Sequence, residues 1–341
     1  MIRSKALLFF FTFFICFGCN FLSSSDKLNF KRDAHFPRWL SNDSYRTDQT
    51  SGITFIGYSM DKYPSFLICD DIGKINRLEI KEDTIFNFYP VHFDSKLDSM
   101  FAMYPKIDFE EIFIDRHTGN IYLSVEGNGP EPVKYTSIFK LNFKDQNVFS
   151  DSIISIEKLD IKPSTDFYRY VKNNLGFEGA AADEKYFYFG FEGFYENGIF
   201  TDSTVIYIVD KNDLSIVKEI STRPLGIHTI CGLYSDENYS LYGVDRNNKN
   251  IFHISFDEEL EISNSVLRTV TTNIPSHPEF DYVVSLESIT IDDKGNIFLV
   301  DDPWRNFFIP PGEVLQKIDE RSVKNFKDFI PVIYKFNLNN N

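Results

Sequence analysis

The segment Glu110-Glu111-Ile112-Phe113-Ile114-Asp115 decides the fold, because related segments recur along the whole chain. Each combines a polar or small start with apolar and β-branched residues, and most end at an Asp where a turn is expected. Alternating apolar residues predict strands, and a pattern that returns at regular intervals indicates a repeat architecture. The starts of the five copies are separated by 53 to 68 residues, and the copies are 51–55, 110–115, 178–183, 231–236 and 287–292.

Two further predicted strands follow each copy. The peptide Ile138-Phe-Lys-Leu-Asn-Phe143 in the third strand of one copy returns almost unchanged as Ile333-Tyr-Lys-Phe-Asn-Leu338. The second strands are expected at 66–69, 121–125, 186–189, 241–244 and 297–300. The third strands are expected at 75–80, 138–143, 205–209, 251–256 and 333–338. Fourth strands are less regular, with candidates at 215–221 and 266–272.

A unit of three or four strands repeated in series is typical of a β-propeller, so we predict an all-β fold of this class. Five copies favour five blades, and a divergent sixth blade has room in residues 56–105 or 140–175. The last copy ends at its third strand, so residues 28–36 are expected to add the outer strand and close the ring. Segment 301–332 is too long for a tight turn and is expected to protrude, with a helical turn within 319–329.

Composition and charge agree with this fold and narrow the partners. The chain has 341 residues, of which 43% are hydrophobic and 16% aromatic, enough for a sizeable core. Six Ala among 36 Phe and 18 Tyr favour strands over helices. The net charge of −15 argues against nucleic-acid binding and favours a cation or a cationic ligand.

The N-terminus has the pattern of a targeting signal. Arg3 and Lys5 precede the apolar run Ala6–Phe17, which is too short for a stable transmembrane helix. Gly18-Cys19 then resembles a bacterial lipobox, which implies lipidation of Cys19 and a lipid anchor in the cell envelope. Plain secretion and an uncleaved anchor are the alternatives.

The expected organisation is therefore a signal peptide with its lipidated Cys at 1–19, a tether at 20–33 and one propeller domain at 34–341. Cys69 and Cys231 remain in the domain. Each lies in an apolar predicted strand, so we expect two buried thiols, with a disulfide left open. We expect a monomer that touches the membrane through its lipid anchor alone.

Acidic residues recur at two equivalent places in the repeat. Glu110, Glu178 and Glu287 stand at strand starts. The loops after the second strands carry Glu126, Glu192, Asp245 and Asp301, 14 residues after the start in three copies and 16 in the other. In a propeller both places lie at one mouth of the central channel. Converging carboxylates repel one another, and Ca²⁺ takes six to eight oxygen ligands of this kind. We predict calcium held by Glu110, Glu178, Glu287, Asp245 and Asp301, the alternative being glutamates that accept backbone N–H groups.

Other residues are candidates for contact with a ligand. Glu126 and Glu192 lie in the same acidic loops, and His228 precedes the fourth strand start. Trp304-Arg305 stands on the long loop after the last acidic pair. A buried core role for His228 and rim packing for Trp304 are the alternatives.

The order of these motifs resembles the SdiA-regulated propeller family and, more distantly, the esterase-like phytase propellers. The resemblance rests on Ser51-Gly-Ile53, Glu110-Glu-Ile112, Gly176-Phe-Glu-Gly179, Cys231-Gly-Leu233 and Glu287-Ser-Ile289, and it runs from about residue 45 to the C-terminus. Glu111 and Ser288 replace Gly of that pattern, and Cys231 replaces Ser. The resemblance implies five blades, an envelope location and a calcium site.

The favoured function is an anchored envelope propeller that binds Ca²⁺ at its channel mouth and recognises a small molecule or an envelope protein. The alternative is a metal-dependent hydrolase of phosphoesters, esters or lactones, with one of the three glutamates as base. A purely structural scaffold is the third reading. A phosphate substrate would call for cations at the mouth, and the sequence offers few beyond Arg246 and Arg305.

Overall fold

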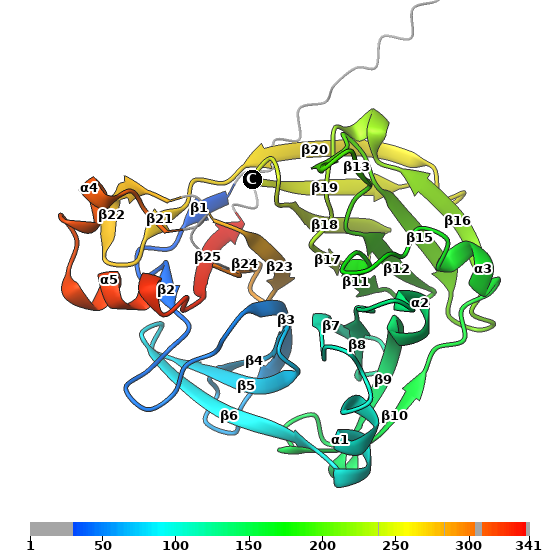
Figure 1. Ribbon diagram of the computed structural model, residues 1–341, viewed down its shortest axis with the longest axis horizontal. Helices are drawn as coiled ribbons and strands as arrows, with labels where there is room; N and C mark the ends of the chain where they lie inside the picture. The colour runs from blue at the N-terminus through cyan, green and yellow to red at the C-terminus, as the bar shows by residue number, and fades with distance from the viewer. Residues whose placement is uncertain (1–29, 238, 283, 304–308, 339–341) are drawn as a thin grey trace, which may run out of the picture.

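The computed structural model describes residues 30–237, 239–282, 284–303 and 309–338 (Figure 1). The predicted signal peptide with Cys19 lies outside the described residues, as do Trp304 and Arg305. Among the described residues, no helix combines the length and the apolar character needed to cross a membrane.

Strands dominate the described chain, and the first eight that follow the N-terminal segment form two antiparallel four-stranded units. The first unit consists of β3 (Thr50–Tyr58), β4 (Pro64–Asp70), β5 (Lys74–Lys81) and β6 (Ile85–Phe93). The second unit consists of β7 (Phe109–Asp115), β8 (Asn120–Val125), β9 (Ser137–Phe143) and β10 (Ser152–Lys158). A short parallel pairing of Ser152 with His92 and of Ile153 with Phe93 joins their outer edges into one eight-stranded sheet. The two stretches in which the sequence left room for a sixth blade, 56–105 and 140–175, thus contain strands of these two units.

Three more units follow. The third consists of β11 (Phe177–Ala182), β12 (Tyr186–Phe191), β15 (Val205–Asp210) and β16 (Ile216–Ser221). The fourth consists of β17 (Gly232–Ser235), β18 (Ser240–Asp245), β19 (Asn250–Phe256) and β20 (Ile262–Thr269). The fifth contains β23 (Leu286–Ile291), β24 (Asn296–Asp301) and β25 (Val332–Leu338). The sequence repeat therefore predicted the first three strands of every unit close to their observed positions.

The fifth unit takes its outer strands from the other end of the chain. β1 (Phe30–Arg32) pairs antiparallel with β25, Phe30 lying opposite Leu338, and β2 (Arg38–Trp39) pairs with the same strand near its start. The expected pairing of residues 28–36 with the last strand is therefore present at 30–32. Residues 30–32 also fall within the predicted tether 20–33, and in the structure they form an outer strand of the sheet.

Short elements lie in the connections between units and between strands of one unit. The helices are α1 (Ser95–Phe101), α2 (Pro132–Tyr135), α3 (Ser164–Phe167), α4 (Gly312–Leu315) and α5 (Glu320–Lys327), with 3₁₀ turns at Lys144–Gln146 and Arg223–Leu225. Two small hairpins are β13–β14 (Tyr195–Glu196, Ile199–Phe200) and β21–β22 (Asn273–Ile274, His277–Asp281). α5 lies within the predicted helical segment 319–329 and confirms it.

The units stand side by side around a common centre, with their first strands innermost, as Figure 1 shows. β3 packs against β7 and β23, β11 packs against β7 and β17, and β17 packs against β23. The arrangement is propeller-like. The inner strands approach closely: a Cβ added to Gly232 would lie 2.6 Å from the Cα of Ser288, so only glycine fits there.

The core lies between neighbouring units. Phe66 of β4 and Phe298 of β24, for example, meet across the first and fifth units with ring centroids 4.7 Å apart. Cys69 and Cys231 are buried free thiols, as predicted. Each unit therefore buries its faces against its neighbours, and the inner strand ends are held in a fixed relative position.

Candidate functional site

β-bulges occur near the start of four of the inner strands. The pairing register shifts at Ser51 in β3, at Glu110 and Glu111 in β7, at Glu178 in β11 and at Glu287 in β23. A bulge adds one residue to a strand and redirects its side chain. Ser51, Glu110, Glu178 and Glu287 all line one cavity at the centre, which we call the mouth cavity.

A second set of side chains comes from the residue directly after each second strand. β4, β8, β12, β18 and β24 end one position before Asp71, Glu126, Glu192, Arg246 and Asp302. All but Glu126 line the mouth cavity, and a Glu126 oxygen lies within 4.8 Å of ligand oxygens of Glu110 and Glu178. One equivalent position of the repeat thus supplies four acids and one arginine.

The mouth cavity has a volume of about 400 Å³, which suits a small molecule. Lys106 and Asp108 reach it from the segment before β7, and the β13–β14 hairpin covers one side with Tyr195 and Phe200. Leu175 adds a further apolar contact. The cavity therefore has a polar, mainly acidic floor and an apolar side.

Arg246 neutralises much of this acidity. Its Nη1 lies 2.7 and 2.8 Å from the two carboxylate oxygens of Glu287, and its Nη2 donates to Glu192. Glu178 Oε2 is 3.6 Å from Nη1. Glu287 also accepts a 2.6 Å hydrogen bond from Ser285 Oγ. The arginine thus takes the place that a metal ion would need beside Glu287.

Lys106 forms the second ionic group of the cavity. Its Nζ lies 2.6 Å from Asp108 and 3.1 Å from Asp71. Glu110 and Glu126 have no ion pair with a described residue. Asp302, which lines the same cavity, also has no ion pair with a described residue, so the acidity without a cation lies on these two glutamates and on Asp302.

Several carboxylate oxygens here are buried without a hydrogen-bond partner. These are Glu126 Oε1, Glu178 Oε2, Asp71 Oδ1 and Asp302 Oδ1, together with Asp108 Oδ1, which has the Lys106 ammonium beside it. Glu126 as a whole is only 2% exposed to solvent. Burying a polar atom unpaired costs roughly 1–3 kcal/mol, so each such oxygen calls for a cation, a water or a ligand donor.

The pKa values of the central glutamates reflect this environment. Burial raises the pKa of Glu110 well above its usual range, and the charges of Asp108, Glu126 and Glu178 raise it further. Burial and Glu192 likewise raise the pKa of Glu126 and of Glu178. Burial raises the pKa of Asp71 to about 6 although Lys106 opposes the shift. Carboxyl groups of this kind either keep a proton near neutral pH or take up a cation.

Three groups of side chains have ligand atoms within 4.8 Å of one another, as a metal site requires. They are Asp108–Glu110–Glu126, Glu126–Glu178–Glu192 and Glu178–Cys231–Glu287. The third contains a thiol, which a hard cation does not favour. Glu126 belongs to both all-oxygen groups and joins them.

Asp245 and Asp301 do not line the mouth cavity. Asp245 accepts hydrogen bonds from the backbone N–H groups of His228 and Thr229, and from the Thr229 hydroxyl at 2.9 Å. Asp301 accepts the backbone N–H of Val332 at 2.5 Å. Asp245 therefore fixes the segment before β17, and Asp301 fixes the start of β25, while their neighbours Arg246 and Asp302 line the cavity.

The structure also places the proposed ligand contacts. Glu192 lines the mouth cavity and pairs with Arg246, and Glu126 lies beside it. His228 does not line the cavity, and its backbone N–H donates to Asp245. Trp304 and Arg305 lie outside the described residues.

Two departures from the family pattern contact each other. Ser288 Oγ lies 2.8 and 3.0 Å from the carboxylate oxygens of Glu111, although the residues are 177 positions apart. Ser288 Oγ also accepts the backbone N–H of Ile53, and Glu111 accepts that of Ile112. Glu111 is 1% exposed, so this pair ties three inner strands together below the cavity.

Sequence reasoning missed Lys106, Asp108 and this buried pair. Lys106 and Asp108 precede the repeated segment and have no equivalent in the other copies, so no period identifies them. The contact between Glu111 and Ser288 could have been predicted from the sequence, since both positions carry a side chain where the resembled motif pattern has glycine.

The comparisons with known proteins found similarity among solved structures only. No family model matches the chain, and no curated protein matches it. Among solved structures, it is similar to a luciferin-regenerating enzyme, with 13% identity over 91% of this chain and 95% of that one and a TM-score of 0.44. A gluconolactonase from Xanthomonas campestris has 10% identity over 89% of both chains and a TM-score of 0.44. A glucose dehydrogenase has 8% identity over 88% of this chain and 98% of that one, also with a TM-score of 0.44. At these values the likenesses carry no information about activity or ligand.

Proposed function

We propose that the chain binds a hard divalent cation in its mouth cavity, with Ca²⁺ as the first candidate, and hydrolyses a small neutral ester or lactone there. The observation that carries the proposal is the pair of buried carboxylate oxygens without hydrogen-bond partners, Glu126 Oε1 and Glu178 Oε2, whose residues can share one metal ion beside a cavity of small-molecule size. A bound cation would satisfy oxygens that the described residues leave unpaired.

The proposal includes a closed propeller of five blades. Its support is the five four-stranded units, the contacts of each inner strand with the next, and the pairing of β1 with β25. Membership of the SdiA-regulated family is part of the same proposal and rests on the order of the sequence motifs.

Glu110, Glu126 and Glu178 are the residues we assign to the cation. Glu126 lies in both all-oxygen groups, and Glu110 and Glu178 flank it from neighbouring inner strands. Glu287 is occupied by Arg246 and Ser285, and the thiol of Cys231 is a poor ligand for Ca²⁺. The cation therefore belongs on the Glu126 side of Arg246.

The residues around this place have the properties of a hydrolytic site. A bound cation supplies polarisation of a carbonyl oxygen. Burial and the charges of neighbouring carboxylates raise the pKa of Glu110 above its usual range while the cation is absent, which favours uptake of a cation by this carboxylate. Tyr195 and Phe200 give the substrate an apolar contact and exclude water from one side.

Charge narrows the substrate class. Three cations line the cavity: Lys106 and Arg246, which already pair with carboxylates, and the exposed Lys172. Eight carboxyl groups lie in or beside it: Asp71, Asp108, Glu110, Glu126, Glu178, Glu192, Glu287 and Asp302. A phosphoester would bring further negative charge into this site, which like-charge repulsion disfavours. We therefore favour neutral esters and lactones over phosphoesters.

The first experiment is a calcium titration of the full chain by calorimetry, with Mg²⁺ in parallel. We expect saturable Ca²⁺ binding that Glu126→Gln and Glu110→Gln each weaken about 10–100-fold, the range seen when even supporting residues of metal sites are changed. The matched control is Glu157→Gln on the outer strand β10, whose exposed carboxylate pairs with Asn142. Absence of Ca²⁺ binding at millimolar concentration would overturn the proposed cation site.

The second experiment tests turnover. Neutral aryl esters and five- and six-membered lactones are supplied with and without a chelator, and we expect hydrolysis that the chelator abolishes and Ca²⁺ restores. Glu178→Gln should remove turnover while the melting temperature changes little. Calcium binding without hydrolysis of any substrate would refute the enzyme and leave the binding protein.

We further propose that Cys19 carries a lipid that anchors the chain in the cell envelope, on the support of the charged, apolar and Gly-Cys sequence at 3–19. Detergent phase partition of the expressed chain should place it in the detergent phase, and Cys19→Ser should move it to the aqueous phase. An unchanged partition in the variant would contradict lipidation.

A further inference from the structure

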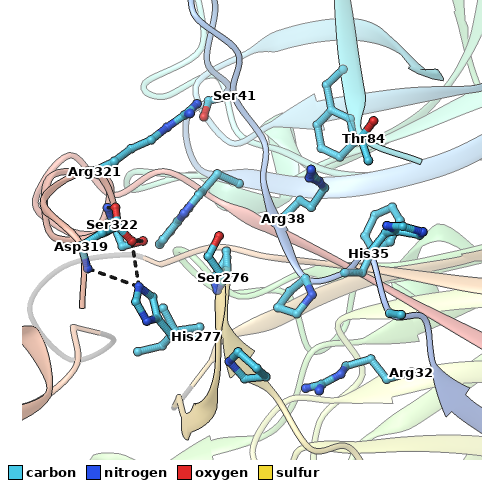
Figure 2. A pocket seen from close by; sticks show the side chains of 18 residues that line it. Arg32, His35, Arg38, Ser41, Thr84, Ser276, His277, Asp319, Arg321 and Ser322 are labelled. Carbon is cyan, nitrogen blue, oxygen red and sulfur yellow. Dashed lines mark hydrogen bonds and ion pairs between the residues drawn. The ribbon is translucent and has the colours of Figure 1, made fainter. Parts of the chain in front are cut away.

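A second charged cavity lies at the outer edge of the fifth unit, and we call it the rim cavity. It has a volume of about 790 Å³ and is enclosed by the β1–β2 segment, the β21–β22 hairpin and the start of α5 (Figure 2). None of the residues that line it lines the mouth cavity. It is therefore a separate place in the molecule, distinct from the proposed cation site.

The rim cavity is basic although the chain is acidic overall. Arg32, Arg38 and Arg321 line it together with His35 and His277. Asp319 is the acid among the described lining residues. Figure 2 shows Arg38 in the middle of the view, with Arg321 on one side and His35 on the other.

The single acid is already occupied. Asp319 caps α5 by accepting the backbone N–H of Ser322 at 3.0 Å and its hydroxyl at 2.7 Å. His277 Nε2 lies 2.8 Å from Oδ2 of the same carboxylate, the oxygen that also accepts the Ser322 hydroxyl. The carboxylate is thus engaged by α5 and by His277, and no ion pair links it to the three arginines.

These three arginines differ from six other arginines of the described residues in having no ion pair. Within the described residues, Arg32, Arg38 and Arg321 form no ion pair, whereas six other arginines do: Arg46, Arg77, Arg116, Arg169, Arg223 and Arg246. Burial and the like charge of Arg321 both lower the pKa of Arg38. Three cations without a counter-charge therefore gather at one cavity, and the protein itself does not neutralise them.

We propose that the rim cavity binds a phosphate group carried by a small molecule or by a lipid headgroup. A guanidinium fork matches phosphate oxygens in a bidentate manner, and Ser41, Thr84 and Ser276 add hydroxyl groups to the lining. The volume exceeds what phosphate alone fills. Pro37, Pro275 and Pro278 give the remainder of such a ligand rigid apolar walls.

The test is calorimetric titration of the full chain in nonionic detergent at physiological ionic strength, where exposed charges are screened beyond about 8 Å. The probes are pyrophosphate and glycerol phosphate in solution, and phosphatidylglycerol added to the same micelles. We expect saturable binding that Arg321→Gln weakens at least tenfold. Arg38→Gln serves as a second variant, in which the same loss is expected.

The matched control is Arg223→Gln, which removes one exposed arginine from a pair with Asp202 outside both cavities. Its binding should equal that of the unchanged chain. Binding of the soluble probes alone indicates a free phosphate compound, and tighter binding of the lipid indicates a headgroup; either supports the proposal. It is overturned if no probe binds saturably, or if Arg223→Gln weakens binding as much as Arg321→Gln. The readout does not involve calcium, so it is independent of the mouth cavity.

Discussion

The mouth cavity and the rim cavity are both charged, but the protein treats their charges in opposite ways. At the mouth, Arg246 and Lys106 are inserted among the carboxylates and pair with Glu192, Glu287, Asp71 and Asp108. At the rim, three arginines face a cavity in which no acid pairs with them. Buried charge must be compensated within the fold, whereas partly exposed charge is screened by solvent and salt.

The difference follows from where each cavity lies. The mouth is built from the ends of inner strands that neighbouring units pack against on both sides, so its side chains are fixed and largely dry. The rim is built from the N-terminal segment, a small hairpin and the long connection before β25. Removal of a paired cation at the mouth should therefore alter folding as well as function, while changes at the rim should alter binding with little effect on folding.

The largest effect is expected from Arg246→Met. The change leaves Glu178, Glu192 and Glu287 without their shared cation, and removing one partner of a buried ionic group costs about 3–5 kcal/mol. Urea unfolding in the presence of a chelator measures the loss. Calcium should restore part of the lost stability, because the freed carboxylates gain a new cation.

Arg223→Met is the control for that measurement, since the Arg223–Asp202 pair is exposed and should leave the unfolding midpoint unchanged. An Arg246→Met chain as stable as the original would show that the ionic group at the mouth does not contribute to folding.

The next effect concerns the buried pair below the mouth. Glu111→Gly removes the acceptor of Ser288 Oγ and of the Ile112 N–H, so we expect a loss of about 2–3 kcal/mol. The double variant Glu111→Gly, Ser288→Gly restores the glycines of the family pattern. It should cost less than the sum of the single changes, by about 0.5–3 kcal/mol, as expected for groups in contact.

Additive costs in this double-mutant cycle would mean that the two replacements are independent. That outcome would also remove the explanation for why both glycines are absent from this chain.

The sequence allowed much of the fold to be predicted, because the repeat is a local pattern that recurs with fixed turns. Asp115 and Gly119 show this well: Asp115 accepts the N–H of His117 at 3.1 Å, and Gly119 has a φ of +73°, as the predicted turn requires. The N-terminal pairing with β25 was also predictable, since the last copy lacked a fourth strand.

The site was predictable only to within one residue. The glutamates at the bulges line the mouth cavity where the repeat placed them, but at the ends of β18 and β24 the predicted acid lies outside the cavity and the next residue, Arg246 or Asp302, lines it. Asp245 and Arg246 are both polar, and the sequence does not show which one faces the channel. The rim cavity had no signal at all, because Arg38 and Arg321 are 283 positions apart and belong to no repeat.

The third prediction uses pH. Burial raises the pKa of Asp70 to about 7 and that of Asp71 to about 6, so the folded chain binds more protons than the unfolded chain above about pH 4. Stability from these groups is therefore present at low pH and lost as pH rises through about 6 to 7. We expect the free energy of unfolding without calcium to fall by about 1–3 kcal/mol across that range.

Calcium should reduce this fall, because a cation favours the charged carboxylates that high pH produces. Thermal melting as a function of pH, with chelator and with calcium, makes the comparison. Stability that rises steadily through this range in the chelator would contradict the direction of these pKa shifts.

The smallest effect is expected at the rim, from Arg321→Gln. Arg321 is exposed and its like charge acts on Arg38, so its removal relieves repulsion and should raise stability by at most a few tenths of a kcal/mol, since solvent screens the pair. High-precision urea unfolding at low salt measures this difference, and added salt should erase it. With pyrophosphate present, the unchanged chain should become more stable than the Arg321→Gln chain, because pyrophosphate binds and stabilises the chain that retains all three arginines. A destabilised Arg321→Gln chain without any phosphate present would mean that the arginine has a folding role, and the contrast between the two cavities would then fail on the rim side.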